Sequence, residues 1–393
     1  MKTRIVMTFC LLAAAMFSAC TQQEDIISEI PDARPALCDF TINASVAPMQ
    51  AVGSGTSSRS LGPMGPEDEN PVKSLAIIQF DSEGNLLQIN KTAGNPYYHY
   101  RDFTDEGKLP GSLSPELEGV TLYPMSDTRV CFIGNMDEES IQKLIYNEAN
   151  TPVGWSDFQN KTVEIEYDTD IYKEDGITIN DDIGHVNQIY LFGYYEGDLS
   201  GSSAPDDGTA ASQMSVVLSR LIARLEIGIS LGEGVELGNN QIYFRLKNVE
   251  KEAYLFLDVD RESYEHDHIE VVTTNRTQYI KEGHGTFYFY VAPHLVKYDK
   301  RENATRILLW CVENAVTDPE KELDEKDAYE VLLCNDPKEE SPTAAGAYWI
   351  NRNSVYHVQL TLTYEDQSRQ TGAPWGVKQA DGSYHYTVNM KKN

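Results

Sequence analysis

Short runs of alternating apolar and polar side chains recur along this chain, with Gly, Pro, Asp and Asn between them. In the first run, Phe40, Ile42 and Val46 share one parity with two small apolar residues, and polar residues fill the other parity. Alternation with a period of two is typical of a strand with one buried face. Further strand-like runs are Val72–Phe80, Thr128–Gly134, Gln241–Val249, Thr286–Val291 and Val355–Thr363. The chain is therefore expected to be an all-β protein.

Two tandem antiparallel β-sandwich domains are the architecture that this pattern favours. A chain of 393 residues favours two domains, and the Gly-, Ser- and Asp-rich stretch Ser200–Ala211 is a natural linker between them. We therefore expect domains at residues 36–212 and 213–364, followed by a tail at residues 365–393. Helical spacing of apolar residues and an acidic first turn predict a short helix over Asp137–Asn147 in the first domain.

The N-terminus has the composition of a secretory signal, which we expect to comprise residues 1–19. Two basic residues precede the short apolar run Ile5–Phe17, and small residues precede Cys20. This arrangement resembles a bacterial lipobox and predicts acylation of Cys20, with residues 20–35 as a lipidated tether to a membrane. Each buried CH₂ of such an acyl chain contributes about 0.8 kcal/mol to membrane attachment. The alternative is cleavage by an ordinary signal peptidase near Ala19.

The charge balance and the motif content exclude several classes of function. The formal net charge is -29, with 61 acidic residues against 32 Lys and Arg. A surface of this kind repels phosphate backbones, so nucleic acid is not an expected partner. The sequence contains no nucleophile elbow, no Gly-rich phosphate loop and no HExxH motif. We therefore expect no enzymatic activity and no cofactor.

Two acidic stretches contain residue types that bind metal ions. His266 and His268 lie near Asp258 and Asp260, but a solvated acidic loop is the simpler interpretation of this group. The stretch Asp168–Gly176 faintly resembles a calcium-binding loop, yet it lacks the terminal glutamate at the required position. No metal site is therefore expected.

Four cysteines remain in the chain after Cys20: Cys38, Cys131, Cys311 and Cys334. An even number is compatible with disulfides in an oxidising compartment. The last two end adjacent strand-like runs, so a cross-strand bridge between Cys311 and Cys334 is one interpretation, and buried free thiols are the other. Their spacing does not match that of metal ligands.

The loop after the first strand, Gln50–Gly62, contains too much Gly and Ser to pack and carries a single basic residue, Arg59. The residues alone permit two interpretations. One is a first edge strand followed by an ordinary surface loop. The other is a removable first strand, tied to the rest of the chain by a loop that a protease can cut.

A last alternating run closes the chain beyond the polar linker Glu365–Asp381. Tyr384, Tyr386, Val388 and Met390 share one parity there, as in the first strand. Such a strand suits a groove that accepts an apolar side chain at every second residue. The linker contains Gly and Pro and is long enough to bridge two subunits. The alternative is that the tail folds back onto its own second domain.

The stretch Met214–Ile227 resembles a motif of the Bacteroidales fimbrillins, the subunits of lipoprotein-derived type V pili. The motif consists of an apolar strand, an arginine, two apolar residues, an alanine, a basic residue and an apolar residue. Other stretches similar to this family occur in the expected order: Val72–Asp81, Thr128–Asn135, Thr286–Val291, Ala304–Leu309 and Asn351–Val358. Together the resemblance covers about residues 36–364.

The resemblance implies a transthyretin-like sandwich fold and a maturation mechanism. In this family an Arg-specific protease removes the lipid and the first strand, and a strand of another subunit fills the emptied groove. Here cleavage between Arg59 and Ser60 would release residues 36–59, although Arg34 is a rival site. The displaced strand would carry Phe40, Ile42 and Val46, and the tail would be the donor strand.

The function implied by the resemblance is that of a structural subunit, a stalk or adaptor, in a cell-surface fimbria that supports adhesion. Its expected partners are other fimbrial subunits, the protease and, in the precursor, the outer membrane. The alternative is a monomeric surface lipoprotein that keeps Cys20 and all its strands and binds glycans. Tyr97, Tyr98 and Tyr100 would then be exposed aromatic residues able to stack on a sugar.

Overall fold

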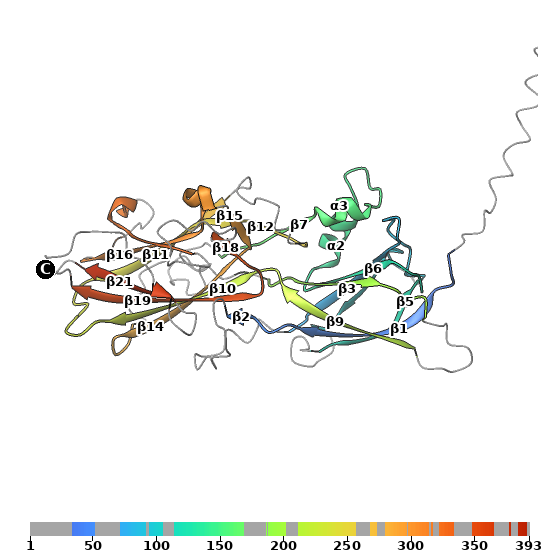
Figure 1. Ribbon diagram of the computed structural model, residues 1–393, viewed down its shortest axis with the longest axis horizontal. Helices are drawn as coiled ribbons and strands as arrows, with labels where there is room; N and C mark the ends of the chain where they lie inside the picture. The colour runs from blue at the N-terminus through green and yellow to red at the C-terminus, as the bar shows by residue number, and fades with distance from the viewer. Residues whose placement is uncertain are drawn as a thin grey trace, which may run out of the picture.

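The structure is a computed structural model, and it describes residues 34–51, 71–91, 94–104, 114–168, 186, 188–201, 211–256, 268–272, 280–296, 298–313, 316, 322–333, 348–364, 377–378 and 384–390. Two β-rich units lie end to end, and strands run from one unit into the other (Figure 1). The expected all-β fold class is confirmed. Within the described residues, no helix is long and apolar enough to cross a membrane.

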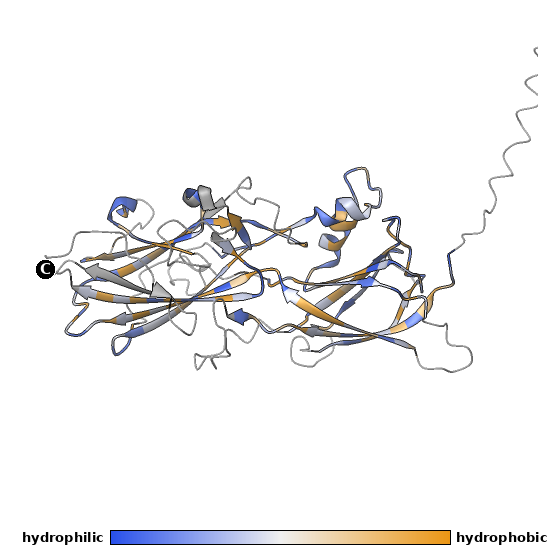
Figure 2. Cartoon of the chain, in the orientation of Figure 1, coloured by the Kyte–Doolittle hydropathy of each residue, from blue (hydrophilic) through white to orange (hydrophobic). Residues whose placement is uncertain are grey.

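The first unit is built on one seven-stranded sheet. Its strands, in spatial order, are β4 (Tyr98–Asp102), β3 (Ser74–Phe80), β6 (Thr128–Gly134), β8 (Leu191–Gly197), β9 (Ser212–Arg220), β1 (Cys38–Val46) and β5 (Glu116–Leu122). One core cluster contains Leu75 and Phe132 from one half of the sheet together with Phe40 and Leu122 from the other half. The sheet therefore folds over its own core, as a sandwich does, and its apolar residues are concentrated along the strands (Figure 2).

The outer face of β3 and β6 is covered by α2 (Glu138–Ile145) and α3 (Trp155–Gln159). The helix expected around Asp137 is confirmed, and its cap explains where it begins. The Asp137 side chain accepts a 2.8 Å hydrogen bond from the Ser140 backbone N–H, which satisfies a donor that the first turn would otherwise leave free. The apolar stripe that includes Ile141 is buried against the sheet.

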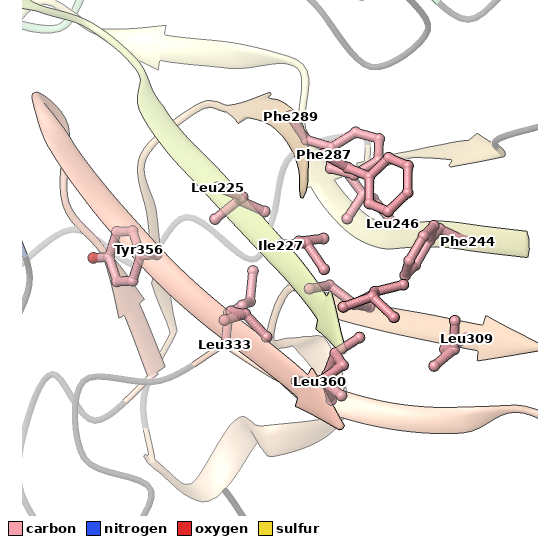
Figure 3. Close-up of a cluster of buried hydrophobic side chains, with 14 of the residues drawn as sticks. Leu225, Ile227, Phe244, Leu246, Phe287, Phe289, Leu309, Leu333, Tyr356 and Leu360 are labelled. Carbon is pink, nitrogen blue, oxygen red and sulfur yellow. The ribbon is translucent and has the colours of Figure 1, made fainter. Parts of the chain in front are cut away.

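The second unit is a sandwich of two sheets. One sheet contains β14 (His284–Val291), β10 (Ala223–Leu231), β19 (Ser354–Tyr364), β21 (Tyr384–Met390) and β20 (Val377–Lys378), with β2 (Gln50–Ala51) also paired to β19. The facing sheet contains β13 (His268–Val272), β11 (Gln241–Glu250), β16 (Arg306–Val312) and β17 (Tyr329–Leu332). Side chains such as Leu225, Phe244 and Leu309 meet between the two sheets (Figure 3). Smaller elements are β15 (His294–Val296), β18 (Tyr348–Ile350), η4 (Tyr298–Asn303) and η5 (Glu325–Asp327).

The two units are joined by strand pairing and apolar contacts as well as by the covalent chain. Strand β7 (Thr162–Glu164) pairs with β12 (Glu252–Tyr254), and Leu255 lies in the same apolar cluster as Ile141 of α2. The chain passes from the first sheet to the second between β9 and β10. The expected linker Ser200–Ala211 therefore precedes the last strand of the first sheet, because β9 pairs with β1 and β8 of that sheet.

Four strand pairs depart from the expected antiparallel pattern. Most neighbouring strands are antiparallel, but β1 with β9, β10 with β19, β2 with β19, and β19 with β21 are parallel. Each of these parallel pairs joins segments far apart in sequence, which is the connection that parallel strands require. Three of the four involve the N-terminal segment or the tail, and the fourth joins β10 to β19.

Candidate functional site

Strand β1 lies inside its sheet. It pairs antiparallel with β5, from Cys38 opposite Leu122 onward, and parallel with β9, from Phe40 opposite Ser212 to Val46 opposite Leu218. The interpretation of the first strand as an edge strand is therefore wrong. Because β1 has a hydrogen-bonded neighbour on each side, its departure would leave two strands with unpaired backbone groups along a common groove.

The apolar parity of β1 points into the core, as the sequence predicted. Phe40 is 1% exposed and Ile42 is fully buried, while Val46 is partly buried against the same cluster. Burial of a large apolar side chain contributes roughly 1.5–3 kcal/mol. The opposite parity includes the exposed residue Asp39. The side chains of β1 thus alternate between the apolar core and the outer face of the sheet.

The first strand does not end at the boundary of its own sheet. After Val46 the chain crosses the junction between the two units, and β2 pairs in parallel with the beginning of β19, Gln50 opposite Ser354 and Ala51 opposite Val355. The path of the N-terminal segment therefore follows β9 in the first unit and β19 in the second (Figure 1). Sequence analysis did not foresee this second contact, because a two-residue pairing carries no periodicity.

The tail occupies the same side of β19, further along. Strand β21 pairs with β19 in parallel, from Tyr384 opposite Val358 to Met390 opposite Tyr364. In the single chain the tail strand thus lies in its own second domain, which is the alternative arrangement that the sequence left open. The side chains of Tyr384, Tyr386, Val388 and Met390 lie outside the described residues.

Several predicted positions fall outside the described part of the chain. These are the lipidation site Cys20 and the cleavage positions Arg59 and Ser60. The rival position Arg34 is described: it is exposed, it precedes β1, and its guanidinium carbon lies 5.7 Å from the centre of the Tyr123 ring. Lipidation and cleavage therefore stay predictions.

The aromatic residues expected to face solvent differ from one another. Tyr98 is buried, so the expectation that it is exposed is wrong. Its hydroxyl donates a 2.6 Å hydrogen bond to Glu138 Oε1, and burial together with this bond raises the pKa of Tyr98 to about 12. Tyr100 is partly buried. Tyr97 lines an open pocket of about 660 Å³, and Asp81 and Glu83 line the same pocket.

The metal and disulfide predictions concern residues that lie partly outside the described part of the chain. No group of His, Cys, Asp and Glu among the described residues could hold a metal ion. Asp258, Asp260 and His266 lie outside that part of the chain, as does most of Asp168–Gly176. Burial raises the pKa of the Cys311 thiol to about 11.

Cys311 lies near the end of β16, and the register of β16 and β17 bears on its proposed bridge. The two strands are antiparallel, with Arg306 opposite Leu332 and Leu309 opposite Tyr329. The end of β16 that carries Cys311 therefore lies beside the start of β17, whereas Cys334 follows its end and lies outside the described residues. This register argues against the cross-strand bridge.

Comparison with known proteins gives structural matches only. No family model matches the sequence, and no curated protein matches it. The tip fimbrial protein Mfa3 from Porphyromonas gingivalis is 14% identical, with 82% of this chain and 93% of that chain covered at a TM-score of 0.49. The fimbrilin FimA from the same species is 14% identical, with 91% and 99% covered and a TM-score of 0.47. A fimbrial assembly protein from Parabacteroides distasonis is 13% identical, with 89% and 99% covered and a TM-score of 0.41.

The chain therefore has structural matches, across most of its length, to fimbrial proteins of the Bacteroidales. The matches concern the same group of proteins as the motif around Met214–Ile227. The three matched structures are described as fimbrial proteins. At these identities the likeness concerns the fold alone.

Proposed function

We propose that this protein is a structural subunit, a stalk or adaptor, of a cell-surface fimbria that supports adhesion. It assembles by exchanging its first strand for a strand of another subunit. The observation that carries the proposal is the position of β1, a buried strand inside its sheet with neighbours on both sides. Its covalent connection to the body of the chain runs through the residues after Ala51.

Maturation requires a cut between β1 and the body. Arg59 is the only Lys or Arg between Val46 and Lys73, so an Arg-specific protease has one target there. A cut after Arg34 would remove the acylated Cys20 but would leave β1 connected to the body. Cleavage between Arg59 and Ser60 is therefore the event that frees both the lipid and the strand.

The cut does not by itself empty the groove. Phe40 and Ile42 stay buried, and the ladders to β5 and β9 persist until another strand competes for them. Direct replacement is favoured over an empty groove, because an open groove exposes apolar surface and unpaired backbone groups. Exchange thus occurs between subunits that are already in contact.

The tail is the candidate donor. Strand β21 lies against β19 of its own chain, and the polar linker Glu365–Asp381 gives it the length to leave that position. In the precursor, the lipid on Cys20 holds the subunit at the outer membrane. After cleavage, the tail of one subunit enters the groove of the next, and the fimbria grows outward from the cell surface.

The test uses Arg59→Ala, with Arg34→Ala as the matched control. We expect wild type and Arg34→Ala to begin at Ser60 by N-terminal sequencing and to form SDS-resistant ladders. Arg59→Ala should keep its N-terminal segment and stay monomeric. Ladders of normal length from Arg59→Ala would refute the proposal. A wild-type surface protein that keeps Cys20 and never polymerises would favour the alternative, a monomeric glycan-binding lipoprotein.

A further inference from the structure

Two polar side chains lie buried at the junction between the two units, directly beside the N-terminal segment. Arg220 is the last residue of β9 and is 2% exposed. Asn353 immediately precedes β19 and is 7% exposed. They are 133 positions apart in the chain, yet Arg220 Nη1 donates a 2.9 Å hydrogen bond to Asn353 Oδ1. The pair therefore marks the point where the strand paths of the two sheets meet.

The backbone around Asn353 holds this residue in an unusual conformation. Its φ is +53°, in the left-handed region that asparagine adopts more readily than most residues. Its N–H donates a 2.7 Å hydrogen bond to the Ile222 carbonyl, between β9 and β10. This bond anchors the turn to the connection between β9 and β10. The side-chain amide and the backbone carbonyl of Asn353 both contact the segment that passes over the junction.

That segment, residues 47–50, is held through its main chain. Arg220 Nη1 donates to the Ala47 carbonyl at 2.8 Å, and Asn353 Nδ2 donates to the Pro48 carbonyl at 3.0 Å. The Asn353 carbonyl accepts a 2.9 Å hydrogen bond from the Gln50 N–H. Each of these bonds uses a backbone atom of the segment, so the contact does not depend on which side chains the segment carries.

We propose that Arg220 and Asn353 form a main-chain clasp that fixes the position of whichever extended chain occupies the groove. In the precursor the occupant is the protein's own first strand. After cleavage it is an extended segment from a second copy of this chain. This inference rests on the proposed strand exchange and adds to it a recognition site at the junction between the two sheets.

The clasp adds hydrogen bonds at a fixed position to the apolar contacts of the groove. Burying a guanidinium or an amide is costly unless acceptors are provided. Departure of the first strand removes the Ala47 carbonyl from Arg220 and the Pro48 carbonyl from Asn353. An incoming strand that ends before the junction leaves both donors without these acceptors, whereas one that crosses it restores them.

The clasp and the apolar parity of the strand place different requirements on an incoming chain. A strand that slips by one residue turns its apolar parity away from the core. Ladder hydrogen bonds alone discriminate weakly among shifted registers, because every residue offers the same backbone groups. Two donors at one fixed point require carbonyls at defined positions, next to a segment that pairs first with β9 and then with β19. Because every residue carries a carbonyl, the clasp requires the strand to extend across the junction, while the apolar parity selects its register.

The test measures retention of the first strand and polymerisation in the same proteins. The full chain is cut after Arg59, and exchange of its N-terminal segment for a labelled peptide of residues 36–59 is followed over time. The main variant is Asn353→Gly. Glycine tolerates the positive φ and keeps the backbone carbonyl that accepts from the Gln50 N–H, but it lacks the side-chain amide. A second variant, Arg220→Met, removes the guanidinium while keeping an extended side chain.

Asn135→Gly is the matched control. Asn135 also has a positive φ and is buried, and its side-chain amide donates to the Pro71 and Ile189 carbonyls. Neither of these contacts involves residues 47–50. We expect Asn353→Gly to release the segment roughly tenfold faster than wild type, consistent with loss of one hydrogen bond to the segment. Asn135→Gly should stay within about twofold of wild type.

The outcomes separate the clasp from the exchange mechanism. The clasp is supported if wild type forms ladders and Asn353→Gly forms shorter ladders or forms them more slowly. Wild-type ladders with unchanged exchange and unchanged ladders in Asn353→Gly overturn the clasp and leave strand exchange intact. Equal acceleration in Asn353→Gly and Asn135→Gly also overturns it, since the effect would then be one of general stability. Absence of ladders from cleaved wild type refutes strand exchange itself.

Discussion

Replacement of Phe40 by alanine tests whether β1 is held in its groove chiefly by its buried side chains. Phe40 is 1% exposed and lies in the core cluster together with Leu75 and Phe132 of the opposite half of the sheet. Phe40→Ala removes the aromatic ring from a site with neighbours on both sides. The matched control is Asp39→Ala, which changes the adjacent, exposed residue of the same strand.

The expected magnitude follows from burial. Truncating a buried phenylalanine to alanine costs about 3–5 kcal/mol, which includes the cavity left behind. In the uncut precursor this loss should appear as a lower free energy of unfolding of the first domain. In the cut protein the same loss acts on a strand held without a covalent bond. Since about 1.4 kcal/mol is a factor of ten, release of the segment should accelerate roughly 10²- to 4 × 10³-fold. Asp39→Ala should change the free energy of unfolding by less than about 0.5 kcal/mol.

Two assays check these values. Urea denaturation, followed by tryptophan fluorescence, gives the free energy of unfolding of the precursor. Exchange of the labelled 36–59 peptide into the cut protein gives the rate of release. If Phe40→Ala releases the segment no faster than Asp39→Ala, the apolar parity of β1 does not hold the strand, and the energetic basis of the exchange proposal fails.

Three other changes have defined outcomes. Cys20→Ala should abolish labelling of the precursor by a clickable fatty acid, and normal labelling would refute the lipidation site. Deletion of residues 383–393, or Val388→Asp, should leave lipidation and cleavage intact but stop polymerisation, and wild-type ladders would show that the tail is not the donor. Burial raises the pKa of Glu226, but the hydrogen bond and the charge of His357, 2.7 Å away, outweigh it and hold the pKa below its ordinary value of 4.5. A depressed pKa stabilises the fold at higher pH, so wild type should be more stable than Glu226→Gln at pH 6. Urea midpoints should converge as the pH falls below 4.5, and a constant difference would contradict this assignment.

Local features of the fold could be predicted from the sequence because each depends on residues close together in the chain. The alternation around Phe40 identified a strand and its buried parity, and apolar spacing with an acidic first turn identified the helix α2. In each case the signal is periodicity or the chemistry of a turn, which a short window contains in full.

Strand order and the junction were decided by tertiary structure. Alternation says which face of β1 is buried but not which strands lie beside it, so β1 could be mistaken for an edge strand. The pairing of Arg220 with Asn353 joins positions that no sequence period connects. The tail strand has the same pattern whether it lies on β19 or in the groove of another subunit. Backbone ladders are chemically alike at every residue, so partner choice depends on long-range packing and on which edges the rest of the fold leaves open.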